Sequence, residues 1–153
     1  VFSRVNRLSI RKGLERVGVN SGIHGRLERF GKKFIFDVAH NLDAIRKLDE
    51  SLSAKLKSNL VVVFGVMKDK DFNPMCEVVA TMGAHVVAVQ PKGKRALIAW
   101  DIFLRVIVAG GKVTNGQTVR RGIGIARKLA GRNGKILITG SNYVVGEAME
   151  VLA

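Results

Sequence analysis

The feature that most constrains this chain is an alternation of short apolar runs with longer helical patterns from residue 33 onward. The apolar runs are rich in β-branched residues and nearly uninterrupted, as in Val61-Val62-Val63-Phe64. Such runs are typical of strands buried on both faces of a parallel sheet. We therefore predict strands at residues 33–38, 60–65, 85–90, 112–114 and 135–140.

Helical periodicity fills the segments between these runs. Apolar residues recur at three- and four-residue spacing on one helix face at Leu42, Ile45, Leu48, Leu52 and Leu56. Asn41 precedes them and is a residue type that caps helix starts. Further helices are predicted at 71–82, 96–109, 118–130 and 142–152. Strands alternating with helices predict an α/β fold: a doubly wound, mostly parallel sheet with helices on both faces.

The length of 153 residues suits one ordinary domain. Residues 1–32 do not join the alternation, and we expect residues 1–24 to be a basic linker, with a short helix at 5–14, ahead of a domain at 25–153. The single cysteine, Cys76, excludes an internal disulfide and suits a reducing, cytoplasmic location. We expect its side chain to be a small buried hydrophobe. No apolar run approaches the roughly 18 residues expected of a membrane span.

The net charge of +14 favours polyanionic partners: nucleotide phosphates, nucleic acid, polyglutamate tails or acidic membranes. Residues 1–36 contribute nine Lys/Arg and two Glu, which is half of the surplus. A solvated basic surface without a specific partner explains the charge equally well.

Ligands of doubly wound sheets bind beyond the carboxyl ends of the strands, which directs attention to the segment 36–41. There a strand ends in Asp37, a candidate ligand for a metal or a ribose, and His40 and Asn41 follow. His40 is a candidate metal ligand or proton carrier. The alternative is structural: a turn-forming carboxylate, a satisfied histidine and a helix cap.

Three further segments carry candidate site residues. Arg26, in Gly-Arg-Leu-Glu, offers a planar fork that suits phosphate oxygens. Lys68 and Asp69 lie in a charged loop after a buried strand, where functional residues concentrate. Ser141 opens a helix after Gly140, where backbone N–H groups could hold a carboxylate. The structural alternatives are a surface arginine, a solvated loop in which Asp71 caps the next helix, and a plain cap by Ser141.

Taken in order, these segments resemble the carboxy-terminal domain of the folylpolyglutamate synthase/dihydrofolate synthase family, in the Mur-ligase superfamily. The family pattern is Gly-Arg-Leu-Glu, Asp-x-Ala-His-Asn, Phe-Gly-x-x-x-Asp-Lys-Asp, an Arg-Ala pair, and Gly-Ser-x-Tyr-x-Val-Gly-Glu. This chain has each element in order across residues 25–152, with Arg95-Ala96 as the pair. The resemblance implies the Rossmann-like fold of Mur-ligase carboxy-terminal domains.

The resemblance also implies a reaction that uses ATP and Mg²⁺. A folate or pteroate carboxylate becomes an acyl phosphate, and the amine of glutamate then attacks it to give an amide, ADP and phosphate. By this resemblance Arg26 contacts ATP phosphate, Asp37 the ribose, and Ser141 the incoming glutamate. His40 would be a catalytic residue near the metal and the glutamate. Asn41, Lys68 and Asp69 would belong to the loops around the site.

The chain departs from the family in ways that shape these expectations. It has Val38 and Leu42 where the family often has Gly and Pro, and it contains no G-x-x-x-x-G-K-[ST] phosphate loop. We expect a missing amino-terminal ATP-binding domain as its partner, and no activity from this chain alone. The alternatives are a diverged basic module that binds nucleic acid or another polyanion, and another Mur-superfamily ligase domain. With 6% aromatic residues, we expect nucleic-acid binding to be weak and non-specific.

Overall fold

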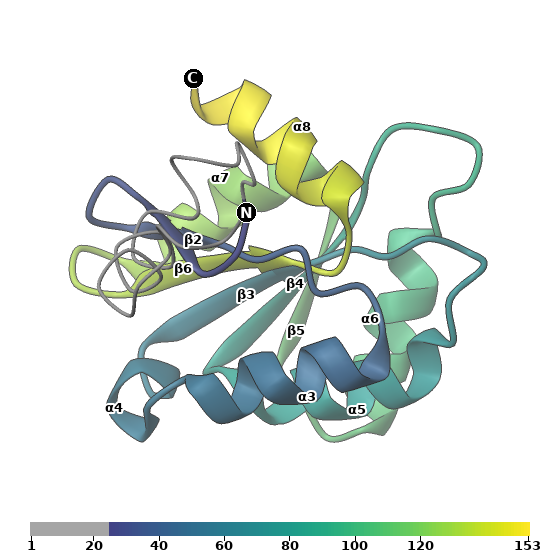
Figure 1. Cartoon of the computed structure of the whole chain (residues 1–153), viewed down its shortest axis with the longest axis horizontal. Helices are drawn as coiled ribbons and strands as arrows, with labels where there is room; N and C mark the ends of the chain where they lie inside the picture. The colour runs from purple at the N-terminus through teal and green to yellow at the C-terminus, as the bar shows by residue number, and fades with distance from the viewer. Residues whose placement is uncertain (1–24) are drawn as a thin grey trace, which may run out of the picture.

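In the computed structural model of the chain, residues 25–153 are described, and they form one six-stranded sheet with helices on both faces (Figure 1). The strands lie in the order β1-β2-β6-β3-β4-β5. Every neighbouring pair is parallel except the β1–β2 hairpin. The predicted doubly wound, mostly parallel α/β fold is therefore confirmed. The strands are β1 (Glu28–Phe30), β2 (Phe34–Phe36), β3 (Leu60–Phe64), β4 (His85–Gln90), β5 (Val113–Thr118) and β6 (Lys135–Thr139).

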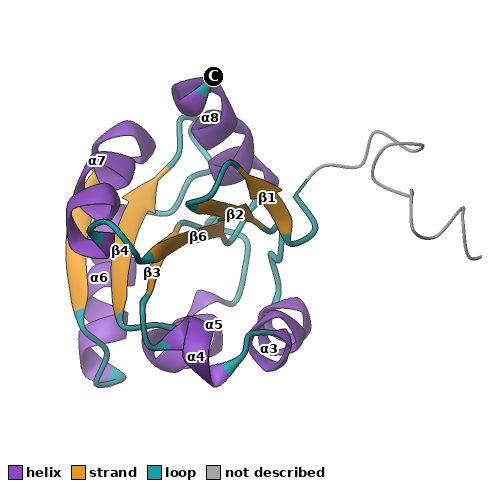
Figure 2. Ribbon diagram, turned by 90° about the vertical axis from the view of Figure 1, so that its left-hand side faces the viewer, coloured by secondary structure: helices purple, strands orange, loops and turns teal. Residues whose placement is uncertain are grey.

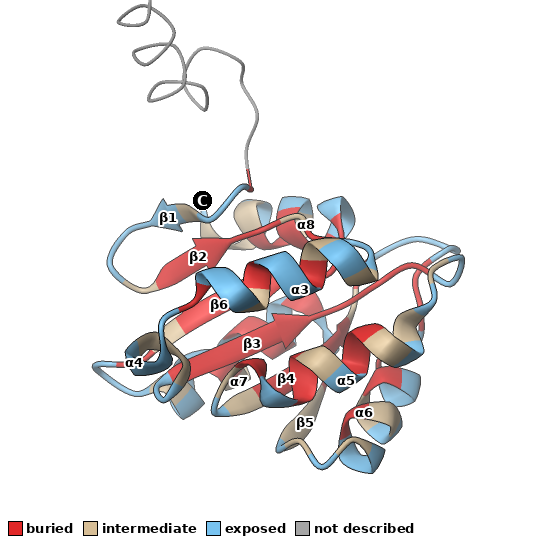
Figure 3. Ribbon diagram, turned by 60° about the horizontal axis from the view of Figure 1, so that its bottom comes forward, coloured by how far each residue is buried: buried red, intermediate tan, exposed pale blue. Residues whose placement is uncertain are grey.

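The helices cover the two faces of the sheet in two groups (Figure 2). Helices α3, α5 and α6 pack on one face, and α7 and α8 pack on the other. All five residues of β3 are buried, and they alternate between the two cores (Figure 3). This double burial explains why the strand reads as a continuous apolar run. The helices are α3 (Leu42–Ser51), α4 (Ala54–Lys57), α5 (Phe72–Met82), α6 (Ala99–Val108), α7 (Val119–Ala130) and α8 (Asn142–Leu152).

Strand β1 is the main difference from the prediction, which placed no strand before residue 33. It pairs antiparallel with β2, with Glu28 opposite Phe36. Two of its three residues are exposed at the edge of the sheet, so it lacks an apolar run. The predicted linker and short helix fall within residues 1–24, outside the described part of the chain.

Three other boundaries also differ. The helix expected from Leu42 to Leu56 breaks at Leu52, which has extended backbone, and Ser53 then caps α4. Helix α6 begins at Ala99 instead of residue 96, because Ala96 forms an antiparallel bridge with Met67. Strand β5 continues to Thr118, beyond the predicted end at residue 114.

Cys76 is fully buried in α5, as expected of a small core hydrophobe. Burial raises the pKa of its thiol to about 12, so the thiolate is scarce at neutral pH. Within residues 25–153 no helix is both long enough and apolar enough to cross a bilayer.

Candidate functional site at the carboxyl edge of the sheet

The candidate residues Asp37, His40 and Ser141 lie at one edge of the sheet, as expected of residues that follow parallel strands. Strands β2 and β6 run parallel, and the backbone N–H of Asp37 donates to Ile138 O at 3.0 Å. The carboxyl ends of both strands therefore meet at this edge. Because β6 lies between β2 and β3, Ser141 sits between the loop that starts at Asp37 and the loop that starts at Gly65.

The carboxylate of Asp37 joins two backbone segments. Its Oδ2 accepts from the N–H of Leu27 at 3.0 Å, and its Oδ1 accepts from the N–H of Ala39 at 2.9 Å. Only 8% of the residue is exposed. Leu27 adopts a positive φ of 46°, which turns its N–H toward the carboxylate. Asp37 thus has a structural task whatever it binds.

The segment before β1 is tied down over this strand end. The N–H of Val38 donates to Gly25 O at 2.7 Å, and the N–H of Gly25 donates to Glu28 Oε2 at 2.8 Å. Gly25 has a φ of +77°, and a Cβ there would lie 2.6 Å from Val38 Cγ1. Only glycine fits this close approach. The loop holds Arg26, which is exposed, beside the end of β2.

Arg26, Asp37 and Asn41 line one open depression of about 510 Å³. Helix α3 supplies most of its other wall, including Asp43 and Lys47. Candidate residues from two separate sequence segments, Arg26 from one and Asp37 and Asn41 from the other, are therefore brought together. Lys47 adds a second cation that the sequence analysis did not single out, because its position on an exposed helix face carries no motif.

His40 is exposed beside this depression and does not line it. Its Nδ1 lies 2.9 Å from Val38 O. A carbonyl oxygen can only accept, so Nδ1 carries the proton, and Nε2 of the neutral ring is left as an acceptor. Asn41 caps α3, since its Oδ1 accepts from the N–H of Ala44 at 2.9 Å, and its predicted capping role is confirmed.

The described residues do not build a metal site by themselves. Residues 25–153 contain no group of three or more His, Cys, Asp or Glu side chains that could hold a metal ion. Mg²⁺ is often bound by one or two protein groups together with substrate phosphates and waters. The arrangement therefore fits an ion held mainly by groups from outside this chain. The lone pair of His40 Nε2 is available as one metal ligand.

Lys68 and Asp69 belong to a second cluster, where the loops after β3 and β4 pair. The N–H of Lys68 donates to Arg95 O at 2.8 Å, and Arg95 Nη2 lies 3.1 Å from Asp69 Oδ1. The hydrogen bond from Arg95 is the main cause that lowers the pKa of Asp69. This second cluster follows β3, whereas the depression follows β2, and two strand spacings, roughly 10 Å, separate these strands. The two clusters are therefore neighbours at the same edge and do not share one cavity wall. Asp71 occupies the N-cap position of α5, but its side chain makes no capping hydrogen bond, so the structural alternative of a cap by the Asp71 side chain is wrong.

Ser141 is buried and caps α8, as its Oγ accepts from the N–H of Val144 at 3.2 Å. The structural alternative for Ser141 is therefore confirmed, and a contact with glutamate stays a prediction. The preceding Gly140 has a φ of +108°, and a Cβ there would lie 2.3 Å from Gly65 O. Close approach of the loops after β3 and β6 thus depends on glycine.

Glu147, on helix α8, makes a contact near the candidate site that could not be predicted from the sequence. Its Oε2 accepts from the backbone N–H of Lys92 at 2.8 Å, which ties the loop after β4 to α8. Its place in the Gly-Ser-x-Tyr-x-Val-Gly-Glu segment was a usable signal. The partner could not be predicted, because it lies 55 residues earlier.

Comparison with known proteins supports the resemblance. The model of the family described as Mur ligase, glutamate ligase domain matches residues 25–142. A curated relative from Haloferax volcanii, a probable bifunctional folylpolyglutamate synthase/dihydropteroate synthase, is 28% identical over 148 residues. That match covers 91% of this chain and 17% of the relative.

Solved structures share the fold over nearly the whole chain. Folylpolyglutamate synthase of Mycobacterium tuberculosis, complexed with ADP and AMPPCP, is 25% identical with a TM-score of 0.77. The ligand-free bifunctional folylpolyglutamate synthase/dihydrofolate synthase of Yersinia pestis has a TM-score of 0.82 at 22% identity. Each match covers 97% of this chain but only 35% of the solved chain. The chain thus spans about a third of the length of these structures.

Proposed function

Since this chain belongs to the Mur ligase family as a glutamate ligase domain, we propose that it is the carboxy-terminal domain of an ATP-dependent ligase that adds glutamate to folate or dihydropteroate. The observation that carries the proposal is the depression lined by Arg26, Asp37 and Asn41 at the carboxyl edge of the sheet. The similarity to folylpolyglutamate synthases favours the folate branch over other Mur-superfamily ligases.

In this proposal Arg26 binds the phosphates of the nucleotide, and Asp37 binds its ribose. The guanidinium of Arg26 is exposed, and its planar fork suits phosphate oxygens. Each oxygen of Asp37 uses one lone pair on a backbone N–H, so each keeps acceptor capacity for a ribose hydroxyl. Support from Leu27 and Ala39 holds the carboxylate in place before the nucleotide arrives, which reduces the entropy lost on binding.

The proposed chemistry has two steps. An oxygen of the folate or pteroate carboxylate attacks the γ-phosphorus of ATP, ADP leaves, and an acyl phosphate forms. The amine of glutamate then attacks the acyl carbon, inorganic phosphate leaves, and the amine loses a proton. His40 Nε2 is a free acceptor at this edge and is our candidate for that proton. Mg²⁺, when bound, would neutralise charge on the phosphates.

Glutamate would lie near the start of α8. Ser141 Oγ accepts from Val144, and its O–H keeps one donor for a carboxylate. Backbone N–H groups at the start of this helix also favour an anion. The loop with Lys68 and Asp69 would close the other side of the site, fixed by its pairing with Arg95.

We further propose that an amino-terminal domain binds ATP and that the carboxy-terminal domain described above closes over the bound ATP. The chain has no phosphate-loop sequence, so the β- and γ-phosphates must be held elsewhere. Phosphoryl transfer depends on positioning and on stabilising developing charge, and half of a site supplies little of either.

The test is Arg26→Ala in an enzyme that joins this domain to its ATP-binding partner. A contact with transferring phosphate gains value as charge develops, so we expect kcat to fall by about 10²–10³-fold while the KM for folate changes little. Arg29→Ala is the matched control, since Arg29 is an exposed arginine outside the depression. Lost folate affinity with unchanged kcat would contradict the assignment.

A further inference from the structure

One part of the chain has cations and no acidic residue. Between Asp101 and Glu147 the sequence contains eight Lys/Arg and neither Asp nor Glu. Helix α7 lies within this stretch and carries four of the eight cations. All four are exposed, and the guanidinium of one of them, Arg127, lies over the Phe34 ring of β2 at 5.3 Å from its centroid. The proposed ligase chemistry uses none of them.

The fold brings cations from the β1–β2 turn next to the end of α7. Lys33 Nζ donates to the carbonyl oxygens of Gly131 and Gly134, the latter at 3.3 Å, and Lys135 Nζ donates to Lys32 O. In Figure 1 the two turns lie side by side at the left-hand end of the sheet. We call the resulting six-residue cluster the basic end surface: Lys32, Lys33, Arg127, Lys128, Arg132 and Lys135.

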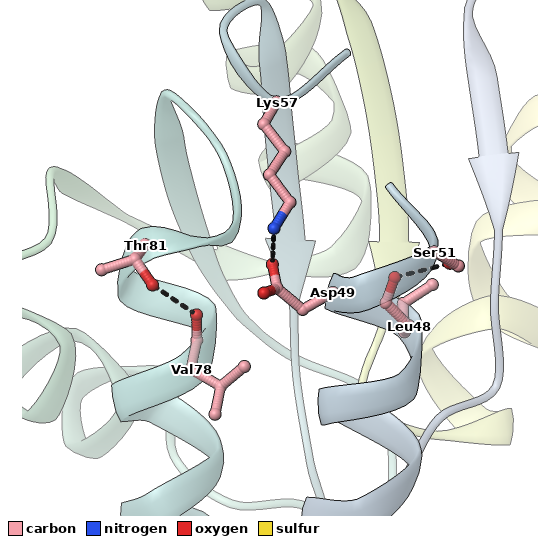
Figure 4. A network of polar contacts seen from close by, with 6 residues as sticks. All are labelled: Leu48, Asp49, Ser51, Lys57, Val78 and Thr81. Carbon is pink, nitrogen blue, oxygen red and sulfur yellow. Dashed lines mark hydrogen bonds and ion pairs between the residues drawn. The ribbon is translucent and has the colours of Figure 1, made fainter. Parts of the chain in front are cut away.

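No carboxylate of the described residues neutralises the basic end surface through an ion pair. The ion pairs of residues 25–153 involve other cations, such as Lys57 with Asp49 at 2.6 Å on the opposite face of the sheet (Figure 4). Glu28 lies at the far end of the β1–β2 hairpin, opposite Phe36. Glu147 and Glu150 line a cavity beside Lys92. The carboxylates of residues 25–153 therefore leave the positive charge of this surface available to an anion.

The basic end surface is remote from the candidate ligase site. It surrounds the amino ends of β2 and β6, whereas Asp37 and Ser141 follow the carboxyl ends of the same strands. A polyglutamate tail bound at the ligase site would have to extend along the whole length of the sheet to reach the basic end surface. We therefore consider a ligand that binds this surface independently of the ligase site.

We propose that the basic end surface binds the phosphate backbone of duplex nucleic acid without reading its sequence. Cations fixed on a helix and two tied turns suit a regular array of phosphates. A single strand would call for stacking platforms, and the nearby hairpin offers one exposed aromatic ring, Phe30. An anionic bilayer would call for an apolar face to insert, but α7 buries Val119, Ile123 and Ala126 against the sheet. Leu129 is the one large apolar side chain of α7 that is exposed, and a single side chain does not make such a face.

The geometry sets the expected salt dependence. Lys33 and Lys135 are engaged with backbone carbonyls. Arg127 lies over the Phe34 ring but is still exposed, so four cations of the surface are left for phosphates: Lys32, Arg127, Lys128 and Arg132. Each phosphate contact contributes about −0.9 to the slope of log K against log salt, so the four contacts of this surface contribute about −4 to the slope. Binding should be measurable at about 50 mM salt and weak at physiological salt.

The test measures fluorescence anisotropy of a labelled DNA duplex of about 20 base pairs with the whole chain, without ATP, between about 50 and 200 mM salt. We expect Lys128→Ala with Arg132→Ala to bind about tenfold more weakly at the lower salt and to reduce the slope by about 2. The matched control is Arg46→Ala with Lys112→Ala, two exposed cations outside this surface and outside the candidate ligase site, on α3 and just before β5. It removes the same charge and should leave the slope nearly unchanged.

Several outcomes would overturn the proposal. Equal weakening by both double variants would assign binding to net charge alone. A preference between two unrelated duplex sequences would contradict backbone recognition. Tighter binding to vesicles of phosphatidylserine and phosphatidylcholine would make the partner a membrane. None of these results bears on the ligase proposal, whose test is turnover at the opposite edge of the sheet.

Discussion

Replacing Asp37 with alanine tests whether the candidate site is built around that carboxylate. The carboxylate accepts two backbone N–H groups, one from Leu27 before β1 and one from Ala39 after β2. Alanine removes both acceptors and leaves both donors in place. Because the bond to Ala39 is buried and the bond to Leu27 is partly buried, water replaces them poorly.

The cost follows from the two lost bonds. A buried donor left without a partner costs about 1–3 kcal/mol, and the partly buried N–H of Leu27 lies toward the lower end. The sum is about 3 kcal/mol of unfolding free energy. For a chain of this length, 1 kcal/mol shifts the melting temperature by about 2–4 °C, so we expect a decrease of about 6–12 °C. Asp37→Asn keeps one acceptor oxygen and should lose about half as much.

Differential scanning calorimetry measures the shift, with Asp71→Ala as the matched control. Asp71 is an exposed carboxylate at the same edge, and its side chain makes no capping bond. We expect that control to change the stability by less than about 1 kcal/mol. If Asp37→Ala lowers the melting temperature no more than Asp71→Ala, the carboxylate does not hold the two segments together.

Two further predictions concern the backbone and pH. Gly140→Ala should destabilise the fold by about 2 kcal/mol or more in urea denaturation, because φ is +108° and the new Cβ would meet Gly65 O at 2.3 Å. The control is Gly124→Ala on α7, where the new Cβ would meet no other atom. It should stabilise the fold by about 0.5–1 kcal/mol. Burial, with a smaller effect from Lys112, lowers the pKa of His85, so the unfolded state binds the proton more readily than the folded state. Unfolding free energy should therefore fall as pH drops through about 6.5 and level off below the native pKa, and His85→Gln should remove that decrease in urea titrations at successive pH values.

The sequence predicted the central strands well because both faces of the sheet are covered. Val61 to Phe64 read as one apolar run, and they alternate between two buried cores. Strand β1 escaped prediction because it lies at the sheet edge with two exposed residues, and its pairing depends on β2. The start of α6 was misplaced for a similar reason, since Ala96 pairs with Met67 from another loop.

The location of the site could also be predicted, but its internal contacts could not. Parallel strands place Asp37 and Ser141 at one edge, and this needs only the fold class. The bond from Leu27 to Asp37 depends on a left-handed backbone at a non-glycine residue, which no local pattern signals. Lys47 lines the depression, and Glu147 binds the loop after β4, because of how helices α3 and α8 pack against the sheet. Helix packing of this kind leaves no local sequence pattern.

The most direct test of the central claim is glutamate-dependent release of ADP, measured for this chain alone and for the chain joined to an amino-terminal ATP-binding domain. If the chain supplies only one half of a ligase site, the chain alone releases no ADP above background with ATP, Mg²⁺, folate and glutamate. The joined protein releases ADP only when glutamate and the folate or pteroate acceptor are both present. Glutamate-dependent ADP release by this chain alone, or none from a folded joined protein, would contradict the account.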